Sequence, residues 1–172
     1  HADFTKWRDG QGVRAIHEPT NFDVYGKIDD IWQDRETGEL IVVDYKSTAR
    51  AKPEYLEPDY YRSGLGSKYK KQQEVYQWLL RRNGFEVSTK FILLYVDGDR
   101  GAKSFFPEPS TELGRLDFRT SLMITDGDDS WIEQILYDMK AVLDQDEIPE
   151  PNMNEPINRY FYQRMQILEG TG

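Results

Sequence analysis

The chain of 172 residues is 38% hydrophobic and 13% aromatic, so it can bury the core of one domain, and an intrinsically disordered chain is excluded. It has neither an apolar run of membrane-spanning length nor a signal-peptide pattern, so we expect no membrane partner and a cytoplasmic, intracellular location. It has no cysteine, which excludes disulfides, thiolate zinc sites and Cys-ligated iron–sulfur clusters.

The length predicts a single domain over residues 1–172. Its first residue, His1, is not an initiator methionine, which is compatible with a domain excised from a longer protein or from part of a complex. The sequence leaves the oligomeric state open.

The first predicted elements are three strands, two of which are joined by a charged turn. Residues 12–18 have the pattern of a short strand, and residues 23–33 that of a longer one. Residues 34–39 are charged with a late glycine, which favours a turn. Residues 40–45 begin with a β-branched apolar run, which is typical of a central strand buried on both faces. We therefore expect the second and third strands to form a hairpin.

The rest of the chain alternates loops, helices and strands. We expect a long loop over 51–66, a helix over 68–82, a strand over 90–96, a turn over 97–101 with a hairpin partner over 103–106, an edge strand over 115–125, a helix that begins at Ser130 and a short helix over 155–168. This order predicts an α/β (α+β) fold in which helices flank a sheet.

Two aspartates and a lysine meet in this hairpin if Gln33 faces Leu40. That register places Asp29 opposite Asp44, with Cβ atoms roughly 5 Å apart. Like charges at this distance need a cation or a proton between them. Lys46 follows on the same face of its strand. Two hard oxygen ligands beside an ammonium predict a site for Mg²⁺ or Mn²⁺ and a phosphate.

A plainer interpretation of the same residues stays open. Asp29 and Asp44 can be solvated side chains of an ordinary hairpin, with Lys46 as a surface lysine that balances them. A one-residue slip of the register would also separate the two carboxylates.

Three short motifs occur in order along the chain. They are Gly26-x-x-Asp29, Asp44-Tyr45-Lys46-Ser47 and Gln72-x-x-x-Tyr76. In this order the chain resembles the PD-(D/E)XK nuclease superfamily, specifically its RecB-like exonuclease branch, over residues 24–97. The resemblance implies a restriction-endonuclease-like mixed central sheet flanked by helices.

The resemblance also implies an activity, the Mg²⁺- or Mn²⁺-dependent hydrolysis of DNA phosphodiester bonds by an exonuclease of RecB type. It implies that Asp29, Asp44 and the backbone carbonyl of Tyr45 hold the metal ion, and that Lys46 acts with the two aspartates in catalysis. Some relatives, including the CRISPR-associated branch, hold an iron–sulfur cluster with cysteines. None is expected here, because the cysteines are missing.

Other site candidates rest on weaker patterns. By resemblance, Gln72 and Tyr76 face the active site and contact nucleic acid; alternatively, Tyr76 is a core aromatic and Gln72 a surface amide. His17 is a candidate further metal ligand, since imidazole binds Mn²⁺. Family members often carry such a ligand on an N-terminal helix, yet no helix is predicted before residue 12.

The basic residues of the chain are concentrated beside this site. Residues 46–82 carry nine basic and four acidic side chains, although the net charge of the whole chain is −9. Lys68, Lys70 and Lys71 are therefore candidate DNA contacts, or else a solvated helix start. Tyrosines interleaved with this charge can stack on unpaired bases or cap a core edge. The alternative function is a non-catalytic nuclease-like domain that binds nucleic acid or a protein partner.

Overall fold

The computed structural model describes residues 10–62, 64–101, 116–147 and 149–169. The chain divides into two units, His1–Gln134 and Ile135–Gly172. Their elements are β1 (Val13–His17), β2 (Phe22–Gly26), β3 (Asp30–Gln33), β4 (Leu40–Arg50), the 3₁₀ helix η2 (Pro58–Arg62), α2 (Gly64–Arg82), β5 (Val87–Asp99), β6 (Phe118–Asp126), α4 (Trp131–Asp144) and α5 (Pro156–Glu169). No helix in these described ranges is both long and apolar enough to cross a membrane.

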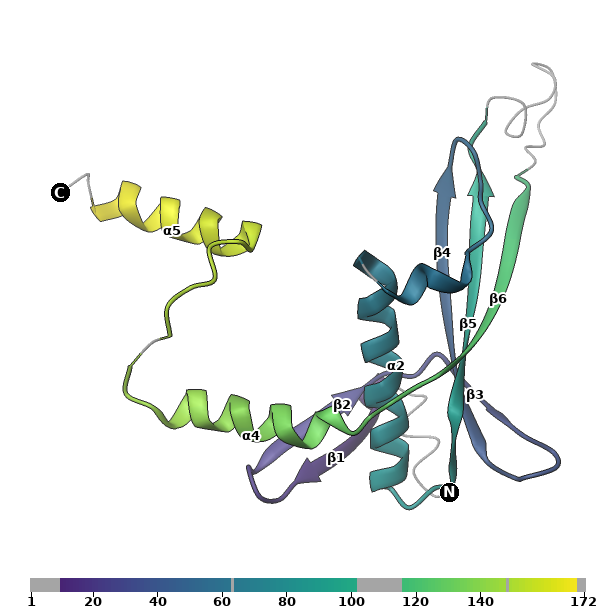
Figure 1. The fold of residues 1–172 in the computed structure, drawn as a ribbon, viewed down its shortest axis with the longest axis horizontal. Coiled ribbons are helices and arrows are strands. Elements are labelled where there is room, and N and C mark those ends of the chain that lie inside the picture. Colours follow the sequence, from purple (N-terminus) through teal and green to yellow (C-terminus); the bar gives the residue numbers. More distant parts are fainter. Residues whose placement is uncertain (1–9, 63, 102–115, 148, 170–172) are drawn as a thin grey trace. The chain divides into compact units, whose positions relative to one another are not determined.

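The first unit contains a mixed sheet with the strand order β3-β4-β5-β6 (Figure 1). Strands β4 and β5 are parallel, and the two outer strands pair antiparallel with them. The chain crosses from β4 to β5 through η2 and α2, while β1 and β2 form a separate two-stranded sheet. This mixed α/β architecture confirms the predicted fold class and has the form of a restriction-endonuclease-like core.

Helix α2 packs against β4 and β5 through a buried stripe that includes Leu79 and Leu80. The buried amide of Gln77 fixes the position of α2 against the start of β5, because its Nε2 donates to the carbonyls of Ser88 and Thr89 at 2.9 Å each. The helix ends at Arg82, as expected, and Gly84 follows it with a φ of 83°, a left-handed conformation that favours glycine. The predicted helix over 68–82 is thus confirmed, with four more residues at its start.

The predicted strand over 23–33 is wrong as one element. Its first part, β2, pairs with β1, and its last part, β3, pairs with β4. The break over residues 27–29 follows Gly26, which packs against the ring of Tyr76 from α2. The split frees Asp29 from any ladder and leaves it at the start of β3.

The predicted turn over 97–101 is also wrong. Strand β5 continues to Asp99, and Gly98 pairs with both Ala49 and Phe118. Strand β4 extends to Arg50, so the Asp-Gly-Asp sequence of β5 still has a parallel partner and remains in the sheet. The hairpin partner expected over 103–106 lies outside the described residues. The edge strand expected over 115–125 is confirmed as β6.

Candidate active site at the β3–β4 hairpin

The register of the hairpin is the one that the sequence predicts. Asp30 pairs with Val43, and Gln33 pairs with Leu40. Continued by one position, this pairing sets Asp29 opposite Asp44. Asp29 is tethered there, since its Oδ2 accepts a hydrogen bond of 3.0 Å from the backbone N–H of Tyr45. The N–H and C=O of a strand residue point toward the same neighbour, so the Tyr45 carbonyl also lies on the Asp29 side of β4.

Asp44 is a buried carboxylate, with a relative exposure of 1%. Burial raises its pKa; Lys46 partly offsets this by a hydrogen bond and by its charge, and the charge of Asp29 raises the pKa further. The Lys46 Nζ donates to Asp44 Oδ1 at 2.7 Å. It also lies 2.5 Å from Oδ2, but that oxygen has no donor at hydrogen-bonding angles among the described residues. The site therefore favours an added cation or proton.

The third motif closes the same site from helix α2. The Tyr76 side chain is 6% exposed, and its hydroxyl accepts a hydrogen bond of 2.7 Å from Gln72 Nε2. Burial chiefly raises the pKa of this hydroxyl, and the charges of Asp44 and Asp29 add to the shift. Tyr76 is therefore near both aspartates, as a core aromatic whose polar end meets the site.

Gly26 makes this approach of α2 possible. A Cβ atom at this position would lie 2.5 Å from Tyr76 Cε1 and 2.9 Å from Cδ1. The ring is buried, so it has little room to move away. The glycine of the first motif and the tyrosine of the third are thus in contact, and they set the position of Asp29 relative to α2.

The structure brings the three motifs to one place, and a family model matches them together. The model of the PD-(D/E)XK nuclease superfamily matches residues 3–154. The chain belongs to the PD-(D/E)XK nuclease superfamily. Its members are nucleases, act on nucleic acids and typically use divalent metal ions. No curated protein and no solved structure matches the chain significantly.

The residues at this PD-(D/E)XK site fit a divalent metal ion. The carboxylates of Asp29 and Asp44 lie close enough for their charges to interact, Asp44 is buried with the Lys46 ammonium as its counter-charge, and the Tyr45 carbonyl lies on the same side. Mg²⁺ prefers such hard oxygen ligands and often uses only one or two carboxylates with several waters. Over the described ranges, no group of three or more His, Asp or Glu side chains could hold a metal ion.

The structure places His17 away from the two aspartates. It lies at the end of β1 with 1% exposure, and both ring nitrogens have protein partners. Nδ1 is 2.7 Å from Thr20 Oγ1, and Nε2 is 2.8 Å from Glu133 Oε2. The other oxygen of Glu133 accepts from Trp78 Nε1 at 3.0 Å. His17 therefore links β1 to α2 and to the start of α4, and we leave it out of the proposed ligand set.

The three lysines at the start of α2 differ in their surroundings. Lys70 forms an ion pair of 2.5 Å with the buried Glu74, and Lys71 lies over the ring of Trp131, 5.9 Å from its centroid. Lys68 is exposed. Two of the three candidate DNA contacts thus have partners within the protein. Glu74 neutralises Lys70, whereas the ring of Trp131 leaves the charge of Lys71 in place.

Sequence reasoning missed two buried acids. Glu74 is 3% exposed and also accepts from Trp131 Nε1 at 2.9 Å, so it holds the first turn of α4. The sequence indicated the burial of Glu74 only through its position between residues of α2 that are themselves buried. Asp97 is fully buried on β5, and its Asp-Gly-Asp context concealed it as a turn.

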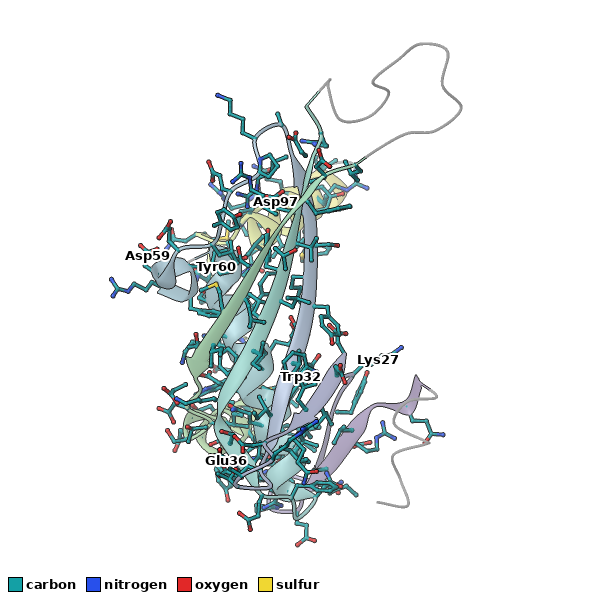
Figure 2. All side chains as sticks on the ribbon, turned by 90° about the vertical axis from the view of Figure 1, so that its right-hand side faces the viewer. Lys27, Trp32, Glu36, Asp59, Tyr60 and Asp97 are labelled. Atoms are coloured by element: carbon teal, nitrogen blue, oxygen red, sulfur yellow. The ribbon has the colours of Figure 1, made fainter. Side chains whose placement is uncertain are left out.

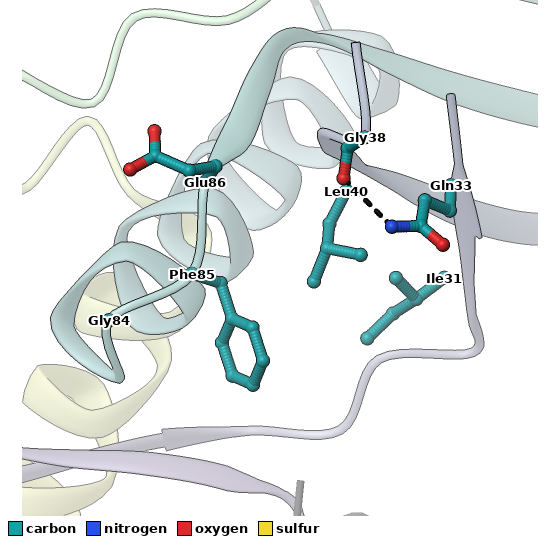
Figure 3. Close-up of a pocket in the computed structure, with 7 residues that line it drawn as sticks. All are labelled: Ile31, Gln33, Gly38, Leu40, Gly84, Phe85 and Glu86. Carbon is teal, nitrogen blue, oxygen red and sulfur yellow. Dashed lines mark hydrogen bonds between the residues drawn. The ribbon is translucent and has the colours of Figure 1, made fainter. Parts of the chain in front are cut away.

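A hollow near the β3–β4 turn is less suited to chemistry. It has a volume of about 540 Å³ and is lined mainly by apolar and backbone atoms (Figure 3). Its residues are Ile31, Gln33, Gly38, Leu40, Gly84, Phe85 and Glu86. None of the proposed catalytic residues lines it, so we do not assign it to the active site.

Gly26→Ala should destabilise the protein by about 1–3 kcal/mol, the typical cost of forcing extra volume into a packed site. The new methyl group would meet the Tyr76 ring. Denaturant unfolding measures the loss. In a Tyr76→Ala background the same change should cost clearly less, because the ring is gone. Equal costs in both backgrounds would show that the contact does not explain the glycine.

Proposed function

We propose that the chain is a metal-dependent nuclease that hydrolyses DNA phosphodiester bonds, an exonuclease of RecB type. The observation that carries this proposal is the buried Asp44 carboxylate, which faces Asp29 and pairs with Lys46. Such a constellation is costly for folding, because the Asp44 charge is buried and lies beside the like charge of Asp29. The cost is understandable if a cation and a phosphate bind there.

Each residue has a role in this proposal. Asp29, Asp44 and the backbone carbonyl of Tyr45 would hold Mg²⁺ or Mn²⁺. When bound, the ion would supply an activated water and neutralise charge on the phosphate. The Lys46 ammonium would orient the attacking water and stabilise the negative charge that builds up on the phosphate in the transition state.

The assignment to the RecB-like branch is supported by the third motif. Gln72 and Tyr76 lie on one face of α2, and their polar ends meet beside the aspartates. From there they would contact the nucleic acid. The resemblance to that branch is also the reason for proposing DNA as the substrate. It is likewise the reason for proposing that nucleotides are removed from an end.

A non-catalytic nuclease-like domain is the second candidate. It is favoured by the ion pair of Lys70 with the buried Glu74, which leaves less free positive charge for a substrate. It is also favoured by the small number of acidic ligands that gather in the described part of the chain. This candidate predicts binding of nucleic acid or a protein without cleavage.

Mn²⁺ or Mg²⁺ should switch on cleavage of linear DNA, and a chelator should abolish it. The same ions should raise the melting temperature, because a ligand that binds only the folded state stabilises it by about 2.7 kcal/mol at 100 times its dissociation constant. A thermal-shift titration and a nuclease assay on one sample test both. Full cleavage in excess EDTA would contradict the metal mechanism, and a melting shift without cleavage would favour the second candidate.

A further inference from the structure

The strand face that bears Asp44 and Lys46 continues toward the end of β4. Alternate residues of a strand share a face, so Thr48 and Arg50 follow on the same side. In the parallel ladder Lys46 pairs with Tyr95 of β5, and Thr48 pairs with Asp97. Figure 2 shows Asp97 and Tyr60 in the half of the sheet that is remote from Glu36 in the β3–β4 turn.

Asp97 is an anchor for Arg50. Its carboxylate has 0% exposure, and a buried charge of this kind needs a counter-charge. Its Oδ2 accepts the backbone N–H of Glu54 at 3.2 Å and lies 3.5 Å from Arg50 Nε. Its Oδ1 has no hydrogen-bond partner within the described ranges. The Nε side of the Arg50 guanidinium is therefore positioned by an ion pair with a buried carboxylate.

The other edge of the Arg50 guanidinium has only long contacts with the protein. The arginine side chain is 40% exposed. Its Nη1 is 3.4 Å from the carboxylate of Glu54, a side chain that is itself 73% exposed, and its Nη2 is 3.5 Å from the Tyr95 hydroxyl. Two parallel N–H donors that are fixed at the base and open at the tip form the geometry that binds a phosphate bidentately.

A row of tyrosines connects Arg50 to Lys46. The ring of Tyr60 meets the ring of Tyr95 edge-on at 5.9 Å and that of Tyr69 at 6.4 Å. The Lys46 ammonium lies 5.1 Å from the centroid of Tyr69. Mainly through burial, the pKa of Tyr60 is raised to about 12, so its hydroxyl stays neutral and does not repel phosphate. Two cations thus flank an aromatic row on one face.

We propose that Arg50, positioned by Asp97, binds a backbone phosphate of an unpaired DNA strand, a few nucleotides away from the phosphate at Asp44 and Lys46. Tyr60 and Tyr69, which are half-buried, supply the ring surface against which unpaired bases rest, as in proteins that bind single strands. The buried Tyr95 packs against Tyr60 and supports it. Four residues of strand separate Lys46 from Arg50, about 13 Å, so a DNA strand that reaches both side chains spans more than one nucleotide. The inference rests on the proposed nuclease function and narrows its substrate to DNA with a single-stranded end.

The test measures binding of labelled oligodeoxythymidylates of increasing length by fluorescence anisotropy, at several salt concentrations and in Ca²⁺ to limit cleavage. Two variants are compared with the wild type: Arg50→Lys keeps a charge opposite Asp97 but removes the fork, and the double variant Arg50→Gln/Asp97→Asn removes both charges together. A neutral pair avoids leaving Asp97 buried and unpaired. Arg14→Lys is the matched control, because Arg14 is an exposed, ion-paired arginine on β1.

The double variant should bind long oligomers about tenfold more weakly, the scale of a lost charge-assisted bidentate contact. Its slope of log affinity against log salt should become shallower by about 0.7, the value for one single-strand phosphate. Arg50→Lys should lose several-fold in affinity, and Arg14→Lys should change neither quantity. Blunt duplex should be affected less than single strands, and dinucleotides least, because they do not reach Arg50.

Wild-type affinity and slope in Arg50→Lys would overturn the inference, and this variant decides alone if the double variant does not fold. An equal loss in Arg14→Lys would also overturn it. Cleavage by Lys46→Ala separates the two proposals. If this variant is inactive while the Arg50 variants bind like the wild type, the subsite is wrong and the nuclease function stands. If Lys46→Ala cleaves normally, only the assignment of Lys46 is wrong. If the wild-type protein leaves linear DNA intact in Mg²⁺ and in Mn²⁺, the nuclease function is wrong, whatever the Arg50 variants bind.

Discussion

Lys46→Ala should abolish the cleavage of linear DNA while leaving Mn²⁺ binding largely intact. The ammonium sits beside the Asp44 carboxylate, where it can reach a phosphate held at the same place. It contributes no ligand atom to a cation, so its loss removes stabilisation of the transition state and not the metal. The expected decrease in rate is about 10²-fold or more, as for other lost transition-state stabilisers. Initial rates with end-labelled DNA in Mn²⁺ measure it.

The matched control for this variant is Lys90→Ala. Lys90 also pairs with an aspartate, Asp126, at 3.3 Å, but this pair is exposed and lies at the other end of the sheet. Exposed ion pairs contribute little to stability, so this variant should fold and cleave like the wild type. If Lys46→Ala digests DNA at the wild-type rate, the assignment of Lys46 is wrong.

Asp44→Asn should abolish both cleavage and the stabilisation by Mn²⁺, and it should raise the melting temperature of the metal-free protein. The sign follows from the raised pKa of Asp44. A carboxyl group whose pKa is higher in the folded than in the unfolded state makes its charged form unfavourable for folding at neutral pH. An amide of nearly the same shape removes that charge. Thermal melts at neutral pH, in EDTA and in Mn²⁺, measure both effects.

Asp126→Asn is the control with the opposite sign. Hydrogen bonds from Thr89 and Lys90 lower the pKa of Asp126, so its charge favours the folded state and its removal should lower the melting temperature slightly. This variant should keep cleavage and the stabilisation by Mn²⁺. A normal melting shift by Mn²⁺ in Asp44→Asn would show that Asp44 is not a metal ligand.

The central part of the site was accessible from the sequence because it is local. Asp29 immediately precedes β3 and Asp44 lies on β4, so both belong to one hairpin, whose turn sets the register. The turn is closed by a hydrogen bond of 2.9 Å from the backbone N–H of Asp34 to the carbonyl of Glu39, which fixes the pairing of the next residues, Gln33 and Leu40. The predicted pairing of Gln33 with Leu40 is confirmed for this reason.

The features that could not be predicted depend on contacts between distant parts of the chain. The break after Gly26 lies where Tyr76 of α2 packs against the backbone, and the turn expected at Asp97 is replaced by a ladder with β4. His17 looked like a metal ligand because its partner Glu133 is 116 residues away. Local patterns carry no information about such partners, so propensity and motif spacing gave the wrong environment for these residues.

The first turn of α4 bears on how the protein can be shortened for laboratory use. Trp131 is bound by Glu74, and Glu133 is bound by His17 and Trp78, so this turn supplies partners to side chains of β1 and α2. Expression clones that stop before residue 131 would remove the partners of Trp78 Nε1 and Glu74 Oε2 inside the fold, at a cost of about 1–3 kcal/mol for each polar group left unsatisfied. A minimal catalytic fragment therefore ends after this turn, whatever follows it.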